Sequence, residues 1–162
     1  MHPLRLPRMP RLGRGFTLIE LMVVVSMLAL LSALAGPGLR QLVDGQRVKS
    51  AAFDLTTDLL LARSEALKRN RIVVFAPRGG DWRQGWTATA NGIELVNRSP
   101  LSANLNFGNA PVSISFNAFG RVDVPANAVR VNLAATDTSN STQRCIELDL
   151  SGRASSRVGS CT

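Results

Sequence analysis

Few side chains in this sequence have the types and spacing needed for acid–base, nucleophilic or metal chemistry. The one histidine is His2, and the two cysteines, Cys145 and Cys161, form no CxxC or Cys/His pattern of the kind that binds zinc. No glycine-rich phosphate loop follows an expected strand, so a nucleotide-binding enzyme has no support either. We therefore expect a protein that is not an enzyme, with no catalytic residue, no metal and no cofactor.

Glu20 is the residue whose position most needs a chemical explanation. It is the only charged residue in the segment 16–35, a run of largely apolar residues that is long enough to cross a bilayer as a helix. A carboxylate in such a span costs roughly 2.5–3.5 kcal/mol near the helix centre, and less near the end. Because a buried charge is tolerated when it is paired, we expect Glu20 to have a partner.

The segment before the apolar run is basic. Residues 1–15 contain no acid and four arginines, namely Arg5, Arg8, Arg11 and Arg14. The positive-inside rule then keeps the N-terminus in the cytoplasm and places the rest of the chain outside the inner membrane. A secretory signal peptide is the alternative, since Ala33-Leu34-Ala35 has the form of a cleavage site. The length of the apolar run and the charge of Glu20 argue against that alternative.

The residues Gly15-Phe16-Thr17-Leu18-Ile19-Glu20 carry a resemblance. They resemble the prepilin peptidase site of type IV pilins and type II secretion pseudopilins. The resemblance implies cleavage by prepilin peptidase after Gly15, N-methylation of Phe16, and pairing of Glu20 with the Phe16 amine of a neighbouring subunit. It also implies storage in the bacterial inner membrane, followed by assembly with other minor and major pilins or pseudopilins through the N-terminal helix.

The segments that follow from this interpretation are a cleaved leader (1–15), a transmembrane and polymerisation half-helix (16–35), an amphipathic half-helix (36–70) and a periplasmic domain (71–162). Gly36-Pro37-Gly38 is expected to bend or loosen the helix, and pilins commonly have a proline at about the position of Pro37. Beyond it, one apolar stripe recurs at helical spacing, formed by Ala52, Leu55, Leu59, Ala62 and Ala66. A second apolar row has a spacing of seven, formed by Phe53, Leu60 and Leu67.

After residue 70 the apolar period becomes that of strands. Asn91-Gly92 lies between two such runs and is a strong signal for a hairpin. The domain therefore reads as an antiparallel sheet packed on the helix, an α+β fold of the pilin type. The polar segment 135–143 is expected to form a loop. The expected strands cover 71–76, 85–90, 93–98, 112–116, 121–124, 129–134 and 144–150.

Four stretches in the half-helix and the domain restrict the resemblance to one family of pilin-like proteins. Residues 62–70 (ARSEALKRN), 81–86 (DWRQGW), 114–121 (ISFNAFGR) and 151–153 (SGR) are similar to the GspH/FimT family of minor pilins and pseudopilins. The resemblance implies a FimT-like minor pilin that takes part in type IV pilus assembly. The alternative is a pseudopilin H-like subunit of a type II secretion system, which serves protein secretion. The two tryptophans, Trp82 and Trp86, are expected to pack in the core rather than to stack on a ligand.

The expected location of the domain in the periplasm favours a disulfide between the cysteines, because the periplasm is an oxidising compartment. Cys145 and Cys161 are the only thiols, and we expect a disulfide that fixes the C-terminal tail to the strand carrying Cys145. Its closed loop of about 16 residues would stabilise the fold by roughly 3 kcal/mol in the chain-entropy model. Free or intermolecularly paired thiols are the alternative.

A DNA-binding role is the last sequence-based hypothesis. Removing residues 1–15 leaves 15 basic against 11 acidic side chains, so the net charge falls from +8 to +4. Resemblance to FimT-like proteins implies DNA capture during natural transformation through a Gly-Arg-x-Arg element, which residues 152–157 match in part. In an extended segment Arg153 and Arg157 would share one face, roughly 13 Å apart, with Arg144 as a third contact. The alternatives are solvated arginines, or arginines paired with Glu147, Asp149 or another subunit.

Overall fold

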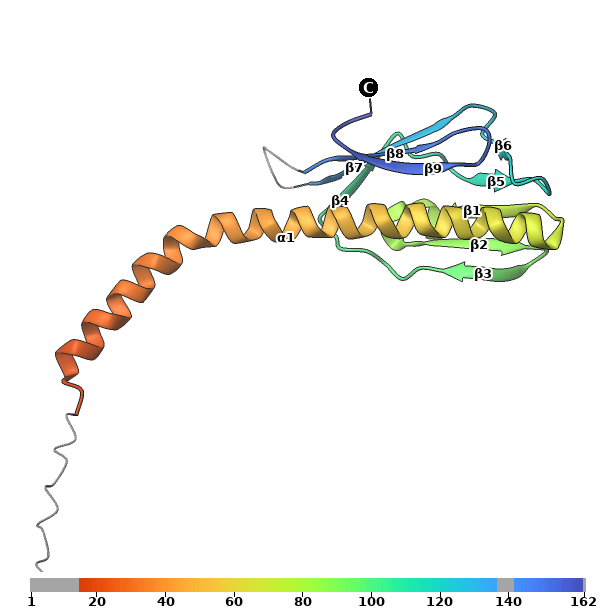
Figure 1. The fold of residues 1–162 in the computed structure, drawn as a ribbon. Coiled ribbons are helices and arrows are strands. Elements are labelled where there is room, and N and C mark those ends of the chain that lie inside the picture. The colour runs from red at the N-terminus through yellow and green to blue at the C-terminus, as the bar shows by residue number, and fades with distance from the viewer. Residues whose placement is uncertain (1–14, 137–141, 162) are drawn as a thin grey trace, which may run out of the picture. The chain divides into compact units, whose positions relative to one another are not determined.

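The computed structural model describes residues 15–136 and 142–161, with only the backbone described for residues 34–37. The leader arginines, His2 and the centre of the predicted loop at 135–143 lie outside the described residues. Within the described ranges the chain forms one long helix, α1 (Leu18–Arg69), two short 3₁₀ helices and nine strands (Figure 1). The chain consists of two compact units, and the boundary between them lies between Pro37 and Gly38.

The 3₁₀ helices are η1 (Arg78–Gly80) and η2 (Trp82–Gln84). The strands are β1 (Val73–Pro77), β2 (Trp86–Ala90), β3 (Ile93–Asn97), β4 (Leu105–Gly108), β5 (Ile114–Phe116), β6 (Val122–Val124), β7 (Val129–Ala135), β8 (Arg144–Leu148) and β9 (Ala154–Val158).

Helix α1 has a recognisable cap at each end. The hydroxyl oxygen of Thr17 accepts the Glu20 N–H at 3.2 Å, so Thr17 is the N-cap and Glu20 lies in the first turn, where the helix dipole favours a negative charge. At the other end Asn70 has a φ of 51°, and Arg71 N–H and Asn70 N–H donate to the carbonyls of Ala66 and Leu67. These two bonds form a Schellman motif. The helix predicted for 16–70 is therefore present within two residues at each end.

The second unit, Gly38–Thr162, has its own hydrophobic core. The predicted stripe of α1 faces that core, since Ala52, Leu55, Leu59, Ala62 and Ala66 are at most 2% exposed. In Figure 1 this part of α1 runs alongside strands of both sheets. The stripe thus forms one wall of the core. Trp82 and Trp86 pack with Phe75 and Phe107 in one aromatic cluster, as the sequence predicted.

The strands form two antiparallel sheets, so the α+β fold predicted from the sequence, a long helix packed on an antiparallel β-sheet domain, is confirmed. One sheet has the order β3-β2-β1-β5-β6 and the other has the order β4-β7-β8-β9. The Asn91-Gly92 hairpin joins β2 to β3, with positive φ values of 50° and 77° at the two turn residues. Two strands, β4 and β9, were not among the predicted ones. Both form outer edges of the second sheet, where little of a strand is buried and the apolar alternation is correspondingly weak.

The register of the second sheet decides which side chains share a face. Cys145 pairs with Arg157 and Asn132, while Glu147 pairs with Ser155 and Arg130. These residues form the outer face. The alternate positions of β8, Arg144, Ile146 and Leu148, point to the inner face, where Ile146 and Leu148 are buried in the core.

Candidate functional site

The N-terminal motif lies in an open region of the described chain. A Cβ added at Gly15 would meet nothing within 4 Å, and Phe16 is 79% exposed. The large apolar side chains from Leu18 to Leu31 are 44–76% exposed. A peptidase therefore has access to the Gly15–Phe16 bond, and the apolar surface that follows is free to contact lipid or another protein.

Glu20 is exposed, and within the described residues nothing pairs with its carboxylate. Its backbone N–H donates to the Thr17 hydroxyl oxygen, and its carboxylate is exposed to any external partner. Pro37 lies within α1, at the boundary between the two units. No single helix of the described chain meets the length and composition criteria for a membrane span, whereas Leu18–Ala33 and Gly38–Arg69 meet them when taken together. The span at 16–35 stays a prediction.

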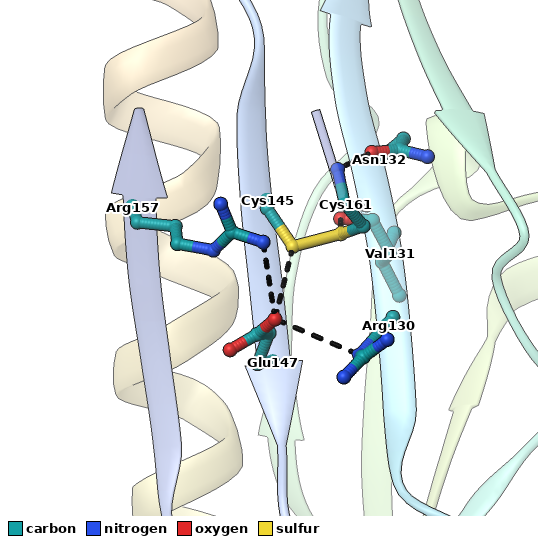
Figure 2. Close-up of a disulfide and its surroundings, with 7 residues drawn as sticks. All are labelled: Arg130, Val131, Asn132, Cys145, Glu147, Arg157 and Cys161. Carbon is teal, nitrogen blue, oxygen red and sulfur yellow. Dashed lines mark hydrogen bonds and ion pairs between the residues drawn. A yellow bond between two sulfur atoms is a disulfide. The ribbon is translucent and has the colours of Figure 1, made fainter. Parts of the chain in front are cut away.

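The predicted disulfide between Cys145 and Cys161 is present, with 5.0 Å between the Cα atoms (Figure 2). Cys145 lies in β8 and is fully buried. Cys161 follows β9, and its N–H donates to the side-chain oxygen of Asn132 in β7 at 2.6 Å. The tail thus crosses back over β8 to reach β7. The disulfide therefore fixes the last residues onto the outer face of the sheet.

The two arginines proposed for DNA share this outer face, but each has a carboxylate beside it. The Arg157 Nη2 lies 3.4 Å from the Glu147 Oε1, and the Arg130 Nε lies 3.6 Å from the same oxygen (Figure 2). The Arg153 Nε lies 3.6 Å from the Asp149 Oδ2. Each of these arginines therefore lies beside a carboxylate of its own chain. Pairing with Glu147 and Asp149 was one of the alternatives to DNA binding in the sequence analysis.

Asp149 organises the turn that carries Arg153. Its carboxylate accepts the Ser151 hydroxyl and, at 3.0 Å, the Arg153 N–H. The hydrogen bond from Ser151, followed by that from the Arg153 backbone, lowers the pKa of Asp149 below its ordinary value. Gly152 in the same turn has a φ of 82°, and a Cβ there would overlap the carbonyl oxygen of Gly120. Only glycine fits this position, which fixes how β9 returns along β8.

Arg144 does not join the other two arginines, which corrects the sequence-based grouping. It occupies the opposite face of the sheet, because it is one residue from Cys145 and side chains alternate along a strand. Its Nη1 lies 3.4 Å from the Ser156 hydroxyl. Its Nε is buried and has no partner among the described residues.

A buried polar cluster that the sequence analysis missed joins α1 to the first sheet. The Asp58 carboxylate is 7% exposed, and its Oδ2 accepts from the Trp86 indole at 2.9 Å and from the Arg98 guanidinium at 2.8 and 3.0 Å. The signal available in the sequence was a pair of acids, Asp54 and Asp58, one helical turn apart beside the apolar stripe. The role of this cluster is to position β2 and the chain after β3 against the helix. In the described parts of the chain, no group of three histidine, cysteine, aspartate or glutamate side chains is arranged to hold a metal ion.

Comparison with known protein families gives two matches. Residues 51–152 match the family described as type II transport protein GspH, and residues 11–36 match the prokaryotic N-terminal methylation motif. The second match contains Gly15, Phe16 and Glu20, the residues singled out from the sequence. A search of curated proteins gives no match.

Solved structures provide a likeness in fold. The chain resembles the type IV minor pilin FimU of Pseudomonas aeruginosa in two crystal forms. The first has a TM-score of 0.60 and 24% identity over 72% of this chain and 96% of that one. The second has a TM-score of 0.57 and 23% identity over 70% and 99%. The long helix packed on antiparallel sheets is thus a pilin fold, and because the family match covers well over half of its residues, the chain belongs to the GspH family of pilin-like proteins.

Proposed function

We propose that this chain is a minor type IV pilin, cleaved by prepilin peptidase after Gly15 and polymerised through the first half of α1. The observation that carries the proposal is the continuous exposure of large apolar side chains from Leu18 to Leu31. Apolar surface of this extent is unfavourable in water, so it must be covered by lipid or by other subunits. The match to the N-terminal methylation motif over residues 11–36 supports the same processing event. The role is structural rather than catalytic, in keeping with the family.

Glu20 gives the polymerisation step its specificity. Cleavage after Gly15 would place a new amino group on Phe16, four residues before Glu20. When helices of neighbouring subunits pack in a filament, the Glu20 carboxylate of one subunit pairs with the Phe16 amine of the next. The pairing offsets the cost of moving each charge away from water. Before assembly the chain resides in the inner membrane, with the second unit in the periplasm.

A pseudopilin of a type II secretion system is the alternative, and the family's own description favours it. The likeness in fold to a minor pilin favours the pilus. Both roles use the same processing site, the same helix and the same Glu20, so they differ in the filament that receives the subunit rather than in the assembly chemistry.

DNA capture is not included in the proposed function. Arg153 and Arg157 face the same side, as a phosphate-binding pair would need, but Asp149 and Glu147 lie 3.6 and 3.4 Å from them. A phosphate would have to compete with these carboxylates. In a mobility-shift assay with the full chain in detergent, we expect Arg153→Ala/Arg157→Ala to bind DNA as the unsubstituted protein does. A loss of salt-sensitive binding in the double variant would restore DNA capture as a function.

The test of the proposed function is the N-terminus and location of the mature protein in its own cells. Mass spectrometry should find Phe16 as the first residue, with the protein present in sheared surface filaments. Deleting the gene should reduce surface pili and leave protein secretion unchanged. Loss of secretion with normal pili would assign the chain to the secretion system instead. A mature protein that begins at Gly36 would show that the apolar segment is a signal peptide.

A further inference from the structure

Arg144 differs from the arginines on the outer face of the same sheet. Arg153 and Arg157 each lie within 3.6 Å of a carboxylate. Among the described residues, the Arg144 side chain has one hydrogen-bond partner, the Ser156 hydroxyl at 3.4 Å from its Nη1, and its Nε is buried without a partner. Buried polar atoms almost always have a hydrogen-bond partner, and an unpaired charged donor is the costliest exception. Among the described residues Arg144 thus has no acidic partner, and its Nη groups are the ones that can donate to a carboxylate of another chain.

The guanidinium lines a groove between α1 and the edge of the second sheet. The groove has a volume of about 450 Å³, with Lys49, Phe53 and Thr56 on the helix side and Arg144 and Ser156 on the sheet side. An adjoining hollow again contains Lys49 and Arg144 and extends along α1 to Gly38. None of the described residues that line either space is acidic. Two cationic side chains thus lie in one groove with no carboxylate between them, which favours an anionic occupant.

The groove also has a large apolar side chain in its wall, Phe53. Phe53 is 70% exposed, although it lies in the globular unit. Phe53 is the first member of the second apolar row of the helix, and the other two members, Leu60 and Leu67, are 42% and 49% exposed. A free phosphate or another small anion would leave these apolar surfaces uncovered, so the occupant must carry apolar groups as well as a charge.

The sheet edge beside the groove can bind an extended chain. Strand β9 is the last strand in the order β4-β7-β8-β9, so its outward N–H and C=O groups have no neighbouring strand among the described residues. An extended peptide adds to such an edge through backbone hydrogen bonds, while its side chains enter nearby pockets. Ser156 places this edge directly against the groove.

We propose that this groove docks an extended segment of a neighbouring pilin-like subunit, and that an aspartate or glutamate of that segment binds Arg144. The guanidinium binds the carboxylate through its Nη groups, in charge-assisted hydrogen bonds. Lys49 adds a second positive charge, and an apolar side chain of the segment covers Phe53. The inference rests on the proposed function, because it requires a filament that brings subunits together.

The experiment is site-specific photocrosslinking in the full chain, expressed in its own cells. A benzophenone amino acid replaces Phe53, and the crosslinked peptide is identified by mass spectrometry. The expected product joins position 53 to another pilin-like subunit, beside an aspartate or glutamate. Arg144→Gln should reduce its yield about tenfold, since a hydrogen-bonded charge pair is lost. Arg157→Gln, on the opposite face of the same sheet, is the matched control and should leave the yield unchanged.

Several outcomes would overturn the proposal. A crosslink to residues 136–142 of the same chain would make the groove an internal contact, and a crosslink to lipid would make it a membrane contact. Equal yields in Arg144→Gln and Arg157→Gln would remove the role of Arg144.

A charge-swap experiment tests the proposed ion pair directly. Arg144→Glu combined with an arginine at the identified acidic position should restore the crosslinked product. Filament incorporation is measured in the same cells: absence from filaments would count against the proposed function, whereas incorporation without an Arg144-dependent crosslink would count against the groove alone.

Discussion

The two halves of helix α1 are both rich in apolar residues, yet only one half buries them within the chain. From Leu18 to Leu31 the large apolar side chains are 44–76% exposed, whereas Val48, Leu55 and Leu59 are at most 2% exposed. The first half is rich in leucine, valine and methionine on every side. The second half places alanines on the face that meets the sheets. Bulky side chains suit a helix that is to be covered by lipid or by other helices, while alanines suit one that is covered closely by its own domain.

The difference separates two sources of stability. The second half of α1 is part of a core that the chain supplies by itself. The first half is helical and carries an N-cap, but its apolar surface has to be covered from outside. Substitutions in the two halves should therefore have different readouts, namely localisation and assembly in the first half and unfolding free energy in the second.

Deleting residues 1–37 is the strongest way to test the comparison. We expect residues 38–162 to be completely lost from the membrane fraction, because the only long apolar segment is gone. The same fragment should still unfold cooperatively, since its core is self-contained. Membrane fractionation and urea denaturation followed by circular dichroism measure the two effects. A fragment that remains with membranes, or that has no cooperative transition, would show that the two halves are not independent.

Glu20→Ala should separate membrane insertion from assembly. Insertion should be retained or improved because the cost of the charge is removed. Incorporation into filaments should fall at least about tenfold, because the Phe16 amine of the neighbour loses its carboxylate. The amount of protein in sheared filaments relative to membranes measures this effect. Ser26→Ala is the matched control, since the Ser26 hydroxyl already donates to the Met22 carbonyl at 2.7 Å within the same helix. Equal incorporation of the two variants would remove the pairing role of Glu20.

Removing the disulfide should weaken the second unit alone. The double variant Cys145→Ala/Cys161→Ala opens a loop with a sequence separation of 16 residues. Its unfolding free energy should fall by about 3 kcal/mol in the chain-entropy model. Asn132→Ala removes the acceptor of the Cys161 N–H but keeps the disulfide, and should cost only about 1 kcal/mol. Thiol titration of the unsubstituted protein, denatured but not reduced, should detect no free thiol. Two reactive thiols in each chain would contradict the disulfide.

Asp58→Ala should destabilise the second unit by about 2 kcal/mol, because the Trp86 indole and the Arg98 guanidinium lose a shared acceptor. Arg98 is 35% exposed, so water can replace part of what its side chain loses. Asp54→Ala is the matched control one turn earlier. Its carboxylate is 30% exposed and 3.8 Å from Arg98, so its loss should cost less than about 1 kcal/mol. Urea denaturation compares the two variants, and equal effects would contradict an anchoring role for Asp58.

The elements that could be predicted from the sequence are those specified by local patterns. The helix was predicted within two residues at each end, because its apolar stripe is regular and Asn70 closes it. The β2–β3 hairpin was predicted from Asn91-Gly92, a pair that accepts the positive φ values of the turn. Strands β4 and β9 were missed because an edge strand is buried on little of its surface and need not alternate.

Contacts that depend on register could not be predicted. Arg144 was grouped with Arg153 and Arg157 because it is next to Cys145, whose disulfide was expected to hold their segment in place. The turn at Gly152 sets Cys145 opposite Arg157, and this register places Arg144 on the other face. The contact of Asp58 with Trp86 and Arg98 likewise joins positions 28 and 40 residues apart. Such pairs are fixed by how the sheets pack on α1, for which a local pattern gives no information.

The pH dependence of the turn at Asp149 should be the smallest of these effects, because the Asp149 side chain is 45% exposed, unlike that of Asp58. The pKa of Asp149 is lowered chiefly by the Ser151 hydroxyl, then by the Arg153 N–H, while the Arg153 charge contributes least. A lowered pKa in the folded state means that the ionised group stabilises the fold. This contribution is present in full above the unfolded pKa of about 3.9 and is lost as the pH falls through the lower folded value. The difference in unfolding free energy between the unsubstituted protein and Asp149→Asn should therefore shrink on acidification through that window.

Carboxyl titration by NMR should show a larger upward shift of the Asp149 pKa in Ser151→Ala than in Arg153→Ala, because Arg153→Ala keeps the backbone N–H. A larger shift in Arg153→Ala would mean that the ion pair, rather than the hydroxyl, holds the turn in place.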